Sequence, residues 1–179
     1  MLLQTRLELD FAAYLAADYD QHSSDNFGHQ IKEYEELYSR FGGLPASYNK
    51  ANTIIHQLWW NKQQIDYKNI GDQLGIDVIT VSTIRQDPGN VLPIHYDTFF
   101  LIGQNHPQRR ELKVRANIYM QDWKLGHHLE YEKDDQWHVN HGWRAGDGLI
   151  WDSTHLHLSS NAGMEPKFTM QISGFLRQN

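Results

Sequence analysis

The sequence predicts a mainly β protein: a double-stranded β-helix, or jelly roll, preceded by a helical N-terminal cap. From Ile76 onward, short β-rich runs alternate with turn sequences rich in Gly, Pro, Asn and Asp. No helical pattern separates these runs, whereas a parallel α/β sheet needs helices between its strands. Helical periodicity is confined to the first part of the chain. We therefore expect one domain of 179 residues, with a helical cap over 1–75 and a jelly-roll core over 76–179.

The cap contains two predicted helices. Apolar residues recur at steps of three and four within Phe27–Phe41, after a capping candidate at Asp25, which is the pattern of an amphipathic helix. A second, shorter helix is predicted over Asp66–Leu74, closed by Gly75, with the apolar segment Leu58–Trp60 ahead of it.

The core consists of short strands bounded by turn chemistry such as the sequence Asp87-Pro88-Gly89-Asn90. The predicted strands are Val78–Ile84, Val91–Phe100, Val114–Met120, His127–Tyr131, Gly148–Trp151, Leu156–Ser159 and Phe168–Phe175. Seven short strands suit a jelly roll.

Composition narrows the class of protein. The formal net charge of -6 argues against nucleic acid as the main partner. Without cysteine, disulfides and thiolate metal sites are excluded, so a metal must be held by imidazole and carboxylate, which suits iron, manganese or zinc. Arg6, Glu8 and Asp10 interrupt the apolar N-terminal run, so we expect neither a signal peptide nor a membrane span, and a cytoplasmic location. Oligomeric state is not encoded in any pattern that we find.

The sequence His95-Tyr96-Asp97 is the strongest functional signal. Residues two apart on a strand project to the same face, so His95 and Asp97 point to one side. With the distant His157 they form the ligand set of a 2-His-1-carboxylate site for non-haem Fe(II), which leaves positions open for substrate and oxygen. The alternative is a surface His and Asp after a Pro-Gly turn.

The segment Trp151–Asn161, followed by Glu165-Pro166-Lys167, resembles the last part of the Fe(II)/2-oxoglutarate-dependent oxygenase core. The closer resemblance is to the aspartyl/asparaginyl β-hydroxylase branch, in which an aromatic-Asp segment precedes the distal histidine and a basic residue ends a Glu-Pro step. It covers Pro88–Phe175, and Trp143–Asp147 matches the family's Gly-Asp turn. Two features depart from the pattern: members of that branch can lack the carboxylate ligand that Asp97 supplies here, and Lys167 stands where arginine is more common.

The resemblance implies a dioxygenase that uses Fe(II), 2-oxoglutarate as co-substrate and O2, with His95, Asp97 and His157 as metal ligands. It implies oxidative decarboxylation of 2-oxoglutarate to succinate and hydroxylation of a C–H bond. The substrate would be a small molecule or an amino-acid or peptide side chain. His155 shares strand parity with His157, and the spacing to Asn161 favours His157 through the resemblance alone.

The co-substrate has several candidate contacts. Lys167 is the anchor that the resemblance implies, with Arg115 as the alternative. Asn117 follows Arg115 on a strand that alternates polar and apolar residues, and the resemblance makes it a further candidate. That polar face either lines a cavity or faces solvent. Thr169 and Gln171 share the parity of Lys167.

Two other functions fit the same fold. A cupin-like protein could bind a metal or small ligand without turnover, because jelly-roll barrels host both functions. A metal-dependent isomerase or hydrolase could use the same ligands with zinc or manganese.

Overall fold

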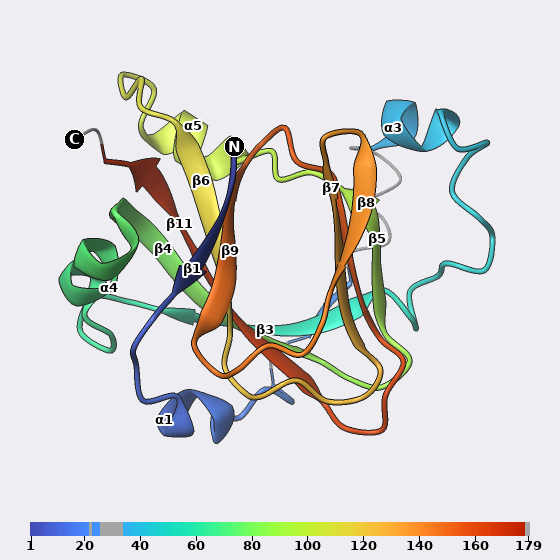
Figure 1. Cartoon of the computed structure of the whole chain (residues 1–179), viewed down its shortest axis with the longest axis horizontal. Coiled ribbons are helices and arrows are strands. Elements are labelled where there is room, and N and C mark those ends of the chain that lie inside the picture. Colours follow the sequence, from blue (N-terminus) through green and yellow to red (C-terminus); the bar gives the residue numbers. More distant parts are fainter. Residues whose placement is uncertain (22, 26–33, 178–179) are drawn as a thin grey trace.

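A computed structural model describes residues 1–21, 23–25 and 34–177, and its fold is mainly β. Two antiparallel sheets face one another (Figure 1). The larger sheet has the order β1-β9-β6-β11-β4-β3-β2 and the smaller sheet the order β5-β10-β7-β8. The predicted jelly roll is therefore confirmed.

The strands of the larger sheet are β1 (Leu2–Arg6), β2 (Ser23–Asp25), β3 (Ile54–Trp60), β4 (Ile76–Gln86), β6 (Lys113–Tyr119), β9 (Asp147–Asp152) and β11 (Lys167–Leu176). Those of the smaller sheet are β5 (Val91–His95), β7 (His127–Lys133), β8 (Gln136–Asn140) and β10 (His157–Asn161). The helices are α1 (Ala12–Leu15), α3 (Glu35–Ser39), α4 (Tyr67–Leu74) and α5 (Phe100–Asn105).

The larger sheet has two different faces, as β6 shows. Ala116 and Ile118 belong to the main hydrophobic core, together with Ile70 and Leu74 of α4. Asn117, between them on the strand, lines a cavity on the opposite face. Because strand side chains alternate, the main core lies outside the sheet pair and leaves the inner face for polar groups.

Helix α4 forms where the sequence predicts it. Asp66 has extended backbone geometry, and its Oδ1 accepts a hydrogen bond from the Asn69 N–H at 3.0 Å, which is the geometry of an N-cap. Gly75 ends the helix in the left-handed region, at φ 68°, where glycine has no steric penalty.

Helix α3 packs against the outer side of the smaller sheet. Leu37 and Tyr38 form a cluster with Ile94 and Tyr96, and the hydroxyl of Tyr34, ahead of the helix, donates to the Tyr96 carbonyl at 2.7 Å. Ile94 therefore faces outward, which turns its neighbour His95 into the barrel.

Residues 1–75 contain more strand than predicted. β1 pairs with β9, and β3, which includes the segment Leu58–Trp60, pairs with β4. Asp25, the capping residue predicted for a helix over Phe27–Phe41, ends strand β2. The predicted start of that helix falls on residues 26–33, outside the described part of the chain, and the structure describes α3 within the rest of the range.

Two strand boundaries also differ from the prediction. The strand predicted over Val91–Phe100 ends at His95, and Phe100 begins helix α5. Strand β8 was not predicted; it forms a hairpin with β7 through Asp134 and Asp135, both at positive φ. Two successive positive φ values are typical of a type I′ turn, and Asp tolerates them.

No helix in the described residues is long and apolar enough to cross a membrane.

The cap of α4 gives a stability prediction. Asp66→Ala removes the acceptor for the Asn69 N–H and is expected to lower the free energy of unfolding by about 1 kcal/mol, measured by urea denaturation. Asp66→Asn keeps a capping oxygen and should stay close to the original protein. Equal losses in both variants would contradict the capping role.

Candidate metal centre

His95, Asp97 and His157 form one cluster, in which a ligand atom from each residue lies within 4.8 Å of the others. His95 ends β5 and pairs directly with His157, the first residue of β10. Their ring centroids are 4.2 Å apart. Antiparallel pairing thus places two imidazoles from distant parts of the sequence side by side, and Asp97 joins them just beyond the end of β5.

Backbone carbonyls orient both imidazoles. His95 Nδ1 lies 2.7 Å from the Pro93 carbonyl oxygen, and His157 Nδ1 lies 3.0 Å from that of His155. Because a carbonyl only accepts, each Nδ1 carries the hydrogen, and each Nε2 keeps its lone pair. This arrangement of a metal-binding histidine, with one nitrogen fixed by a hydrogen bond, is common in metal sites.

Asp97 is a buried carboxylate with two partners on the larger sheet. Trp151 Nε1 donates to its Oδ2 at 2.7 Å, and Arg115 Nε lies 3.3 Å from the same oxygen. Burial alone would raise the pKa of Asp97, but the charge of Arg115, the two histidines and the Trp151 hydrogen bond together hold its pKa below the usual value. The group is therefore ionised at neutral pH.

His157 is neutral at the same pH. Burial, reinforced by the neighbouring His95, lowers the pKa of His157 to about 3. A neutral imidazole is the form that binds a metal. The cluster thus combines an anionic carboxylate with imidazole lone pairs, a donor set suited to a divalent first-row metal.

His155 lies near the cluster but points elsewhere. Its Nδ1 is 3.0 Å from Asp152 Oδ1, and its backbone carbonyl is the group that fixes His157. Residues 153–156 form a turn and irregular chain rather than strand, so the shared parity of the two histidines has no structural meaning.

Lys167 is buried in the same interior. It lines a narrow cavity of about 30 Å³ together with His95, His157 and Asn117. The ammonium donates to the His128 carbonyl at 2.6 Å, to Ser159 Oγ at 2.6 Å and to the Ser160 carbonyl at 3.0 Å.

No carboxylate of the described residues pairs with Lys167. Burial lowers the pKa of Lys167 to about 7, while its three acceptors favour the charged form.

Arg115 occupies a different position. It lines a wider cleft of about 390 Å³ that also borders His95 and Asp97, and its Nη1 donates to Gln171 Oε1 at 2.6 Å. Its charge faces Asp97, whereas the charge of Lys167 faces neutral acceptors.

The polar face of β6 lines this interior. Asn117 is buried beside the narrow cavity, as is Thr169 of β11, and the half-buried Gln171 also lines it, so the solvent-facing alternative is wrong. Sequence reasoning missed the role of Trp151 as a partner of Asp97. The aromatic-Asp pair at 151–152 was visible in the sequence, but the direction of its indole N–H was not.

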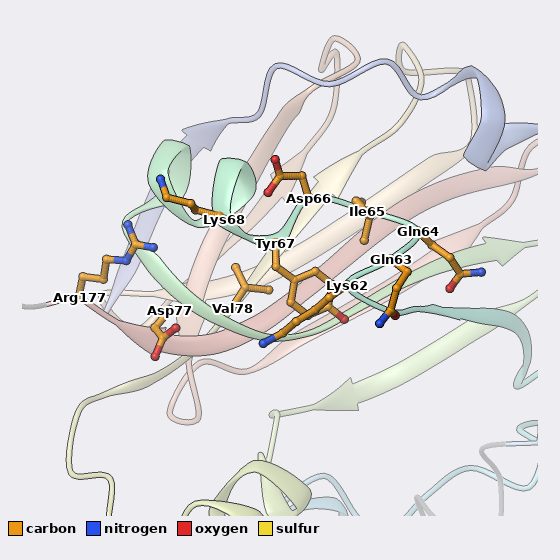
Figure 2. A pocket seen from close by; sticks show the side chains of 10 residues that line it. All are labelled: Lys62, Gln63, Gln64, Ile65, Asp66, Tyr67, Lys68, Asp77, Val78 and Arg177. Atoms are coloured by element: carbon orange, nitrogen blue, oxygen red, sulfur yellow. The ribbon is translucent and has the colours of Figure 1, made fainter.

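Another hollow lies away from the candidate metal ligands. An open groove of about 570 Å³ runs between the segment Lys62–Lys68 and Arg177 (Figure 2). Its Lys68 and Arg177 both pair with Asp72, at 2.5 and 2.7 Å. None of the three candidate metal ligands lines this groove.

No protein-family model matches the chain, and no curated protein matches its sequence. Solved structures do share its fold. A prolyl-4-hydroxylase from Pseudomonas putida aligns with a TM-score of 0.53 and 16% identity over 99% of this chain and 93% of that one.

Two further neighbours come from nogalamycin biosynthesis, and both are described as non-haem alpha-ketoglutarate-dependent enzymes. The carbocyclase SnoK aligns with a TM-score of 0.53 and 11% identity over 97% of this chain and 79% of that one. The epimerase SnoN aligns with a TM-score of 0.54 and 9% identity over 84% of this chain and 77% of that one. At these identities the likeness establishes the fold. The resemblance to the aspartyl/asparaginyl β-hydroxylase branch stays a prediction.

The hydrogen bond from Trp151 to Asp97 predicts an effect on metal affinity. Trp151→Phe removes the indole N–H and should weaken Fe(II) binding by about 10- to 100-fold, because partners of metal ligands commonly contribute that much. Anaerobic Fe(II) titration measures the change.

Trp143 provides a matched control, since it is buried in the same apolar cluster and its Nε1 has no hydrogen-bond partner among the described residues. Trp143→Phe should leave Fe(II) affinity within about threefold of the original, allowing for the usual spread of such effects. Similar losses in both variants would assign the effect to packing.

Proposed function

We propose that this protein is an Fe(II)- and 2-oxoglutarate-dependent dioxygenase that hydroxylates an organic substrate. The observation that carries the proposal is a His-Asp-His cluster whose two histidines line a narrow cavity with Lys167, which pairs with no carboxylate of the described residues. The fold shared with alpha-ketoglutarate-dependent enzymes agrees with it.

His95, Asp97 and His157 would hold the metal. Their donor set fits Fe(II), and the carbonyls of Pro93 and His155 orient both imidazoles. Bound iron would activate O2, the oxidant, and 2-oxoglutarate would supply two of the electrons as it is converted to succinate and CO2. The protein would orient these reactants and exclude water from them.

Lys167 would anchor the far carboxylate of 2-oxoglutarate, and Asn117 would contact the molecule along the cavity wall. The three hydrogens of the ammonium are already donated, so a carboxylate must replace one acceptor. The Ser160 carbonyl, at 3.0 Å, is the most distant of the three. The cavity of about 30 Å³ is close to the share of one water in the liquid, so lining side chains must also move outward.

Two alternatives make different demands on Lys167. A cupin-like binding protein without turnover, or a zinc or manganese isomerase or hydrolase, would use the same ligands. Neither has a use for the charge of Lys167, whose three acceptors already make its burial tolerable. An oxygenase uses that charge directly for its anionic co-substrate.

Turnover of 2-oxoglutarate is the decisive test. Protein loaded anaerobically with Fe(II) and 2-oxoglutarate should release succinate when exposed to oxygen. His157→Ala should abolish this release, because it removes one of three facial ligands, whereas His155→Ala should retain most of it. Oxygen exposure that yields no succinate from iron-loaded protein would reject the oxygenase. Loss of succinate release in His155→Ala alone would make His155, rather than His157, the metal ligand.

The role of Lys167 predicts a change in co-substrate affinity. Lys167→Met keeps an apolar stem and removes the charge, so the Michaelis constant for 2-oxoglutarate should rise at least about tenfold, as expected for loss of one charge-assisted hydrogen bond. Succinate formation at varied 2-oxoglutarate concentration measures it.

The same lysine predicts a pH dependence. The protonated form binds the carboxylate, and its pKa is about 7, so affinity for 2-oxoglutarate should fall as the pH rises above that value. Lys167→Met should lack this dependence. An unchanged affinity in the Met variant would transfer the anchor to Arg115.

A further inference from the structure

We infer that the substrate of this centre is a neutral, largely apolar organic molecule with a hydrogen-bonding group, rather than an amino acid or a charged peptide side chain. The inference rests on the proposed function, because it takes the substrate site to be the cleft beside His95 and Asp97. That cleft, of about 390 Å³, has the size of a small-molecule pocket.

The charges in the cleft are balanced. Apart from histidine, the charged side chains among its described lining residues are Asp97 and Arg115. Arg115 Nε lies 3.3 Å from Asp97 Oδ2. A divalent metal bound at Asp97 would add a charge of 2+, which the two carboxylates of 2-oxoglutarate would offset. With both bound, a substrate ammonium or carboxylate would lose its hydration without gaining an unpaired partner, which is unfavourable. A neutral substrate carries no such penalty.

Apolar side chains form the mouth of the cleft. Trp59 of β3 and Phe100 and Leu101 of α5 all line it, yet their exposed fractions are 61%, 66% and 64%. Large exposed apolar groups gathered at one opening mark a binding surface, because covering them removes apolar area from water.

The backbone at Phe99 builds one side of this mouth. Phe99 has φ 50°, a conformation that bulky residues rarely adopt, and its ring is buried against Ile102 and Phe175. The packing holds this conformation, and helix α5 begins at the next residue with Phe100 exposed. The packing of Phe99 thus fixes this side of the apolar mouth, which is not a loosely held loop.

Two hydroxyl groups lie in the wall formed by the larger sheet. Thr80 of β4 and Ser173 of β11 are direct cross-strand partners, and both line the cleft. Ser173 is only 4% exposed, and neither hydroxyl forms a side-chain hydrogen bond within the described part of the chain. A hydroxyl both donates and accepts, so this pair suits a substrate alcohol or carbonyl.

Competition between matched ligands tests the charge preference. The protein loaded with Mn(II) and saturating 2-oxoglutarate is mixed with the neutral fluorophore N-phenyl-1-naphthylamine, which is then displaced by 1-naphthalenemethanol, 1-naphthylmethylammonium or 1-naphthoate. We expect the alcohol to displace it at a concentration at least about tenfold lower than either ion, since burying an unpaired charge is the larger penalty. Equal or better displacement by an ion, or no binding of the fluorophore, would overturn the inference.

Three variants locate the binding. Trp59→Ala should weaken binding of the fluorophore and of the alcohol, and Ser173→Ala should weaken the alcohol alone, each by several-fold. Trp137→Ala is the control, since this tryptophan is 43% exposed on β8 and does not line the cleft. Loss of binding in Trp137→Ala with none in Trp59→Ala would place the ligand elsewhere and overturn the inference.

These results are independent of 2-oxoglutarate turnover. Preference for the alcohol without succinate formation in the iron-loaded protein would reject the proposed function and keep the neutral cleft. Succinate formation with preference for an ion would reject the inference alone.

Discussion

The two-faced larger sheet is the constraint on which the rest of the structure depends. Its outer face carries Ala116 and Ile118 into the main core under α4, so much of the apolar burial is obtained outside the sheet pair. Hydrophobic burial is the dominant favourable term in folding. Because that burial lies outside, the inner face can carry Asn117, Lys167 and Thr169, which would destabilise an ordinary sandwich core.

The candidate metal centre also connects the two sheets. His95 and His157 come from the smaller sheet, whereas Asp97 is held by Trp151 and Arg115 of the larger one. An unpaired buried carboxylate is unfavourable, so the position of Asp97 requires both contacts across the barrel. The geometry of the ligand set therefore depends on how the two sheets face each other, and a ligand cannot be considered apart from the fold that places it.

Sequence reasoning identified the parts of this arrangement that depend on local pattern. Alternation predicted the strands of the core, Asp66 and Gly75 predicted the ends of α4, and parity placed His95 toward the interior. It failed where distant contacts decide the structure. Residues 54–60 form a strand because β4 offers an edge to pair with. No local pattern contains that contact.

The two cavities beside the candidate metal centre differ in how their positive charges are paired. This difference affects which ligands each cavity can bind. On one side, the narrow cavity ends at Lys167, whose charge is met by a hydroxyl and two carbonyls. On the other side, the wide cleft contains Arg115, whose charge is met by Asp97. Under the proposed function, an anion would be drawn to the narrow side, where the positive charge has no anionic partner among the described residues, and a neutral molecule would be better accommodated on the wide side. A metal ion bound between two such regions would sort two different ligands by charge alone, without a separate recognition element for each.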